Sequence, residues 1–81
     1  MREWLQDAQT RVAEHVGEEP SAYALGEHEV ELLLALAGTA AHSSGDRTNA
    51  PLATFLAGLA LGRHGDASLE EIAAAASGTP S

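Results

Sequence analysis

Apolar residues recur at three- and four-residue intervals in four stretches of the chain, which is the spacing of one face of an α-helix. The first stretch is Glu3–Val16, and Gly17 directly after it can adopt the left-handed conformation that ends a helix. Its apolar face carries Trp4, Leu5, Ala8, Val12 and Val16. Because large aromatic side chains are usually buried, we expect Trp4 to anchor this face in the core.

The second stretch runs from Glu27 to about His42 and is apolar over most of the circumference of a helix. A helix of this kind lies in the middle of a bundle or beneath a partner protein. Gly38 lies inside the stretch, where glycine costs up to about 1 kcal/mol relative to alanine. The sequence leaves two explanations open, a close helix crossing at Gly38 or an end or bend of the helix there.

The third stretch, Asn49–Arg63, has the clearest start and end signals. The side-chain oxygen of Asn49 can cap the first turn, and Pro51 falls where a missing backbone N–H does no harm. The stripe expected to face the core consists of Leu52, Phe55, Leu56 and Leu59. Small residues recur every fourth position beside it, at Thr54, Gly58 and Gly62.

These small residues, together with Gly38, are the candidate packing or interface positions. We predict that Gly38 and Gly58 let the second and third helices approach closely. On this hypothesis Gly58→Leu strongly destabilises the fold.

The fourth stretch begins at Ser68, which forms a capping-box pattern with Glu71. Apolar residues then continue at helical spacing to Ala76, and Gly65 can close the preceding helix. Residues 77–81 have no periodicity and are expected to be a disordered tail. The pattern predicts an all-α fold, with residues 1–76 forming a single domain as a small bundle of four helices joined by short loops.

Size and charge narrow the possible partners. A domain of 81 residues has a small core and thin stability, so docking onto a protein partner or a second copy is expected. The net charge is −8 and there is no lysine, which argues against nucleic acids and anionic membranes as partners. The longest apolar run, Val30–Ala37, is too short to span a bilayer, and the polar start does not resemble a signal peptide. A cytoplasmic location is therefore the default.

Catalytic and metal chemistry finds little support in the sequence. There is no cysteine, and the histidines, His15, His28, His42 and His64, stand without a second ligand at helical spacing. No nucleophile motif, phosphate loop or compelling carboxylate pair is present. We predict no catalytic residue, no metal site and no cofactor.

One polar constellation precedes the third helix: His42, Arg47, Thr48 and Asn49. An arginine and hydroxyl or amide side chains around a helix N-terminus suit a phosphate or carboxylate group. The alternative is a purely structural loop, in which Arg47 pairs with Asp46 or with a carbonyl of the second helix. Both interpretations stay open at the level of sequence.

Around these residues the chain resembles a known family. The similarity is carried by Glu3, Trp4 and Leu5 and by His42, Arg47, Ala50, Pro51, Leu52, Thr54, Phe55, Leu56 and Gly58. It extends from Glu3 to about Ala76, with its specific part between Arg47 and Gly58. The resemblance is to a small actinobacterial domain of unknown function that is found with, or fused to, molybdenum cofactor guanylyltransferase (molybdopterin-guanine dinucleotide biosynthesis) proteins. Members tend to carry proline after the arginine, where this chain has Thr48.

The resemblance implies an accessory role near molybdenum cofactor maturation, with the nucleotidyltransferase chemistry belonging to the partner. This chain is too short for the α/β nucleotide-binding fold and lacks its glycine-rich loop. Our first hypothesis is a noncatalytic accessory or protein-interaction module that docks on such a guanylyltransferase. The second is a small-anion or nucleotide binder that uses the loop before the third helix.

Overall fold

The computed structural model describes residues 2–78, and four α-helices and one short 3₁₀ helix make up most of this part. They are α1 (Arg2–Val16), η1 (Pro20–Tyr23), α2 (Glu27–Ser44), α3 (Asn49–Arg63) and α4 (Leu69–Ser77). The predicted all-α fold of four helices is therefore confirmed. The end of the expected tail, residues 79–81, lies outside the described residues.

Helix ends follow the local signals with small shifts. Gly17 and Gly45 take left-handed conformations with φ of 77° and 73°, and each follows the last turn of a helix. Ser68 caps α4, where its hydroxyl accepts a hydrogen bond from the backbone N–H of Glu71 at 3.1 Å, so the predicted cap is confirmed. Helix α2 continues through Gly38 without a break and ends at Ser44, two residues beyond the predicted end.

The start of α3 differs from the prediction by one residue. Asn49 is the first residue of the helix, and Thr48 occupies the capping position without a side-chain cap bond. The cap is replaced by backbone turns, in which the N–H groups of Asn49 and Ala50 donate to the carbonyls of Asp46 and Arg47, both at 3.1 Å. Backbone hydrogen bonds thus take the place of the predicted Asn49 cap.

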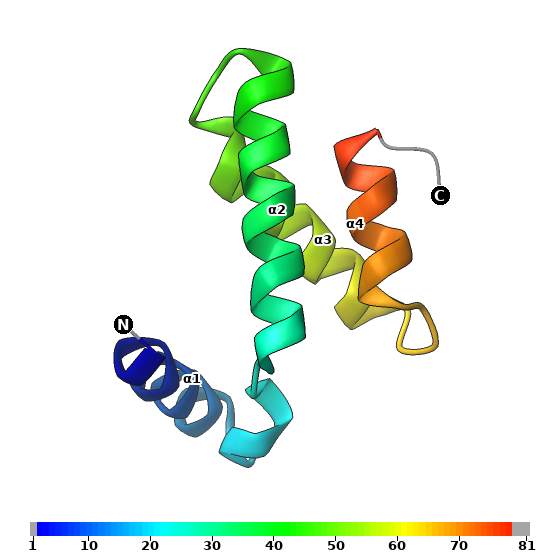
Figure 1. Cartoon of the computed structure of the whole chain (residues 1–81). Helices are drawn as coiled ribbons and strands as arrows, with labels where there is room; N and C mark the ends of the chain where they lie inside the picture. The colour runs from blue at the N-terminus through cyan, green and yellow to red at the C-terminus, as the bar shows by residue number, and fades with distance from the viewer. Residues whose placement is uncertain (1, 79–81) are drawn as a thin grey trace.

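Three helices form the packed centre of the molecule. Figure 1 shows α2 and α4 running side by side, with α3 crossing behind them and connecting the end of α2 to the start of α4. Their contact is a small core of Leu36, Ala57 and Ala73, with Ala53 and Ile72 packed against it. Alanine side chains dominate this core, so the helices meet over small surfaces.

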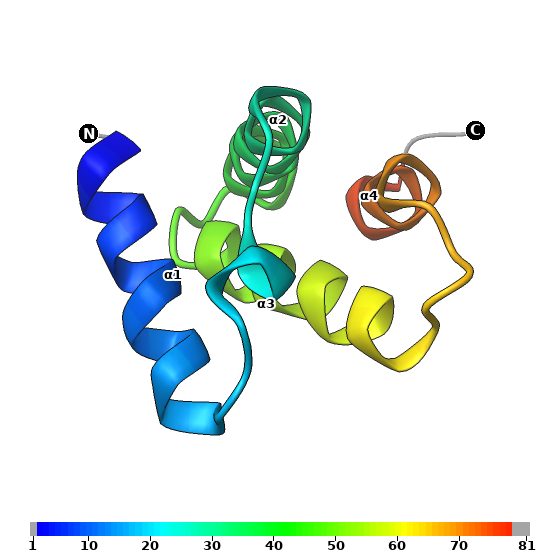
Figure 2. The ribbon, with the colours of Figure 1, turned by 90° about the horizontal axis from the view of Figure 1, so that it is seen from below.

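Helix α1 lies apart from this centre. Among the described elements it packs against η1 and not against α2, α3 or α4, and Figure 2 shows it standing to one side of α3. A hydrogen bond from the backbone N–H of Leu25 to the side-chain oxygen of Gln9, at 3.3 Å, ties α1 to the connector that follows η1. The core of the domain is therefore built mainly by three of the four helices.

The expected core stripe of α3 is wrong. The side chains of Leu52, Phe55, Leu56 and Leu59 are 60%, 69%, 61% and 45% exposed, and we call them the outer ridge of α3. The opposite side of the helix, centred on Ala57 at 1% exposure, packs against α2 and α4 instead. The small side has the shape that fits the crossing of three helices, and this shape outweighs the greater hydrophobicity of the ridge.

Two further expectations are also wrong. Trp4 does not anchor α1 in the core, because its side chain is 70% exposed. The Arg11 guanidinium lies over the ring, 5.8 Å from its centroid. Gly38 and Gly58 do not form a close helix crossing, because no heavy atom lies within 4 Å of the position that a Cβ would occupy at either glycine. Helices α2 and α3 do pack together, but through other residues.

Candidate functional site

The loop between α2 and α3 holds the residues predicted to bind an anion. His42 lies in the last turn of α2, Arg47 and Thr48 lie in the turn, and Asn49 opens α3. His42, Arg47 and Thr48 are exposed, and Asn49 is half-buried. The structure thus places all four in one short loop region without enclosing them.

An acidic side chain organises this loop. Oδ1 of Asp46 accepts hydrogen bonds from the hydroxyl of Thr48 at 2.7 Å and from its backbone N–H at 3.0 Å. These two bonds, the one from the hydroxyl above all, hold the pKa of the Asp46 carboxyl below its ordinary value, because they stabilise the charged form. The hydroxyl and the backbone N–H of Thr48, one of the candidate anion ligands, therefore already donate to a carboxylate.

The backbone donors of the α3 N-terminus are also engaged. The N–H of Thr48 bonds to Asp46, those of Asn49 and Ala50 bond to loop carbonyls, and Pro51 has none. An anion at a helix N-terminus depends on such groups being free. The anion-binding hypothesis stays a prediction, and it would rest on the exposed Arg47 guanidinium rather than on the helix end.

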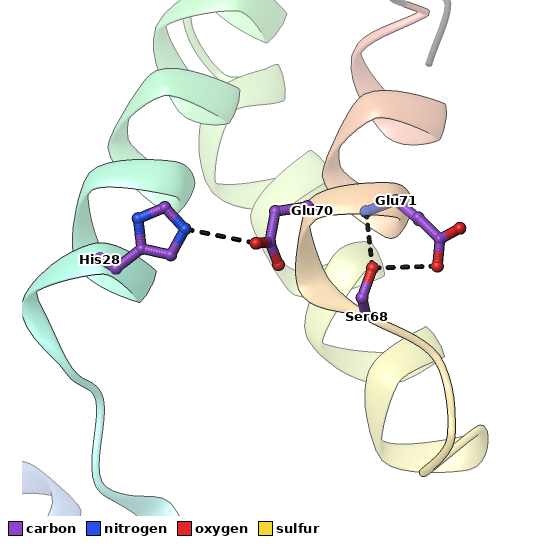
Figure 3. A network of polar contacts seen from close by, with 4 residues as sticks. All are labelled: His28, Ser68, Glu70 and Glu71. Atoms are coloured by element: carbon purple, nitrogen blue, oxygen red, sulfur yellow. Dashed lines mark hydrogen bonds and ion pairs between the residues drawn. The ribbon is translucent and has the colours of Figure 1, made fainter.

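The histidines are dispersed over the described part of the chain. His28 bonds through Nε2 to Oε2 of Glu70 at 3.3 Å and links the starts of α2 and α4 (Figure 3). The pKa of Glu70 is lowered, first by its own backbone N–H at the start of α4 and second by His28. Within residues 2–78 no three histidine or carboxylate side chains gather where they could hold a metal ion.

Figure 3 also shows the cap beside this pair. The hydroxyl of Ser68 contacts both the backbone N–H and the carboxylate of Glu71, the latter at 3.0 Å. Each polar group in this region has a structural task at a helix start.

The feature with the strongest functional geometry is an open groove between α1 and α3, which we call the α1–α3 groove. Its volume is about 570 Å³, within the range of small-ligand and peptide sites. Its walls are Leu5, Ala8 and Val12 of α1 on one side and Gly58, Leu61 and Gly62 of α3 on the other. The end of η1, the connector around Leu25 and Glu29 of α2 complete the lining. Two of the predicted interface residues, Gly58 and Gly62, therefore lie in this groove, whereas Gly38 and Thr54 do not line it.

Sequence reasoning missed the α1 wall of the groove. The apolar face of α1 was assigned to the core because its spacing is that of a buried helical face. In the structure much of this face is open to solvent, with Trp4 70%, Val12 48% and Val16 52% exposed. The only signal that could have found the groove is the pair of glycines in α3, since their lack of side chains leaves room beside the helix.

Comparison with known proteins identifies a family but no function. A family model described as "Domain of unknown function (DUF6457)" matches residues 1–80. No curated protein and no solved structure matches the chain. No described helix is both long enough and apolar enough to cross a membrane. The family match spans nearly the whole sequence, and the chain belongs to the DUF6457 family.

Proposed function

We propose that this member of the DUF6457 family is a noncatalytic protein-interaction module that works in the cytoplasm and receives a partner segment in the α1–α3 groove. The observation that carries the proposal is the groove itself, an apolar channel between two helices that do not pack against each other. Binding modules commonly seat an amphipathic helix in a groove of this kind.

The walls of the groove support this proposal. Leu5, Ala8 and Val12 give one apolar wall, and Leu61 gives part of the other. A helix docked between them would bury side chains that the free domain leaves partly in water. Burial of apolar surface is the main driving force of such association.

The glycines of α3 support the same proposal. A glycine inside a helix costs up to about 1 kcal/mol relative to alanine. At Gly58 no neighbouring atom lies within 4 Å of a Cβ position, so packing within the domain does not account for that cost. A partner backbone that approaches α3 closely at Gly58 would account for it.

Charge indicates the kind of partner segment. The chain carries a net charge of −8, and Glu29 lies at the groove. Complementary charge speeds encounter and selects partners. The proposed ligand is therefore an amphipathic helix with an apolar stripe for the groove and basic residues beside it.

The resemblance described above suggests where this segment belongs. We propose a molybdenum cofactor guanylyltransferase as the protein partner, with this chain in an accessory role. On this proposal the partner performs the chemistry.

The test is direct binding of the full chain to a purified guanylyltransferase by calorimetry, with a groove-filling variant. A Cβ added at Gly58 would meet no neighbouring atom within 4 Å, so Gly58→Leu should fold normally and lose at least tenfold in affinity. Gly38→Leu is the matched control, since Gly38 is also an uncrowded helix glycine but lies outside the groove. Equal affinities of wild type and both variants would refute the groove, and no binding by wild type would refute this partner.

A further inference from the structure

The outer ridge of α3 is a second apolar surface, and the proposed function does not use it. Its residues, Leu52, Phe55, Leu56 and Leu59, follow the spacing of one helical face and are 45% to 69% exposed. Gly58, which lines the groove, lies about a quarter turn around the helix from the middle of the ridge. Ridge and groove are therefore neighbouring surfaces that can be altered separately.

The size of the ridge matches a small dimer interface. Its four side chains form a run of exposed apolar surface along one helical face, and apolar patches of roughly 300–600 Å² on a monomer are often functional. A standard interface covers about 800 Å² per partner, of which somewhat more than half is apolar. The ridge would supply much of that apolar part.

The distribution of charge favours a second copy as the occupant. The chain carries a net charge of −8, yet α3 contains no acidic residue from Asn49 to Arg63. Two copies that approach through α3 therefore keep most of their carboxylates away from the contact. A positive charge, Arg63, lies in the last turn of the same helix.

An antiparallel arrangement brings opposite charges together. If two α3 helices pair about a twofold axis between Phe55 and Leu56, Leu52 of one copy lies opposite Leu59 of the other. The same register places Arg63 opposite Thr48, beside the Asp46 carboxylate. Both hydrogen bonds that Thr48 donates to this carboxylate end on Oδ1, and neither uses Oδ2.

We propose that two copies of this chain form an isologous dimer through the outer ridge of α3, with an Arg63–Asp46 ion pair between copies at each end. The interface is self-complementary, as twofold symmetry requires, because every contact occurs twice. The ridge residues supply the apolar centre, and the two ion pairs fix the antiparallel direction.

Sedimentation equilibrium of the full chain over micromolar to millimolar concentrations tests the dimer. Wild type should show a concentration-dependent monomer–dimer equilibrium, and Phe55→Glu should raise the dissociation constant at least tenfold with unchanged circular dichroism. Val12→Glu, an exposed apolar position of similar kind in the groove, is the matched control and should dimerise as wild type does. A wild type that stays monomeric, or a dimer insensitive to Phe55→Glu, would overturn the proposal.

Charge reversal tests the direction of pairing. Arg63→Glu and Asp46→Arg should each weaken the dimer several-fold, and the double variant should restore most of the wild-type affinity. Failure of this rescue, in variants that remain folded, would overturn the antiparallel register. Because partner binding is tested at Gly58, the results at Phe55 and Arg63 decide the dimer independently of the proposed function.

Discussion

Alanine substitution at the two interior helix glycines should stabilise this domain. Gly38 and Gly58 lie inside α2 and α3, and neither has a neighbouring atom within 4 Å of a Cβ position. The substitution removes backbone freedom from the unfolded chain and creates no clash, so each should raise the free energy of unfolding by up to about 1 kcal/mol. For a domain of this size, that gain corresponds to an increase in Tm of about 4–8 °C.

The assay is thermal and urea denaturation followed by circular dichroism, at low protein concentration. Gly45→Ala is the internal control because Gly45 ends α2 with φ of 73°, where an alanine costs about 1–2 kcal/mol. Alanine should therefore stabilise the protein at Gly38 and destabilise it at Gly45, only seven residues away. A loss of stability for Gly58→Ala would refute the reasoning, because it would mean that another helix packs closely against that position.

Three further predictions concern single side chains. Glu70→Gln should make the free energy of unfolding depend less on pH in the acid range. The pKa of Glu70 is lowered on folding, so its contribution to stability is present above the ordinary value of 4.5 and is lost as the pH falls through the lower folded value. Urea midpoints at pH 7 and pH 3 measure this, and an equal change at both would contradict it. Ser68→Ala should cost about 1 kcal/mol by removing the cap of α4, whereas Ser43→Ala, at an exposed site, should cost little. Trp4→Ala should change stability by less than about 1 kcal/mol, and the emission maximum of Trp4 should shift little on unfolding; a large red shift would show a buried ring.

The helices themselves could be predicted because their signals are local. Gly17 after α1 and the Ser68–Glu71 cap each act within one turn, through bonds that neighbouring residues can make alone. The end of α2 lies two residues beyond the prediction, and the start of α3 differs by one residue because backbone turns replace the side-chain cap of Asn49. These shifts are small because competing turn geometries differ by little free energy.

The candidate site was less predictable. The loop with Arg47 could be located from the sequence. The hydrogen bonds to Asp46 and to backbone carbonyls, which engage the donors of this loop, could not be predicted. To predict the α1–α3 groove, one must know that α1 packs against η1 and leaves α3 uncovered. Two segments that are far apart in the sequence form this groove, so the spacing of apolar residues within either segment does not predict it.

The sequence by itself determined four helices, their approximate limits and their all-α class, because helix formation depends on residues within a few positions of one another. Only the tertiary structure decided which face of each helix turns inward. Helix α3 has an alanine side and a side of large apolar residues, and the pattern favoured the second, yet Ala57 is buried and Phe55 is exposed. Small side chains let three helices meet closely, and this packing depends on all three helices together. The large residues are left at the surface.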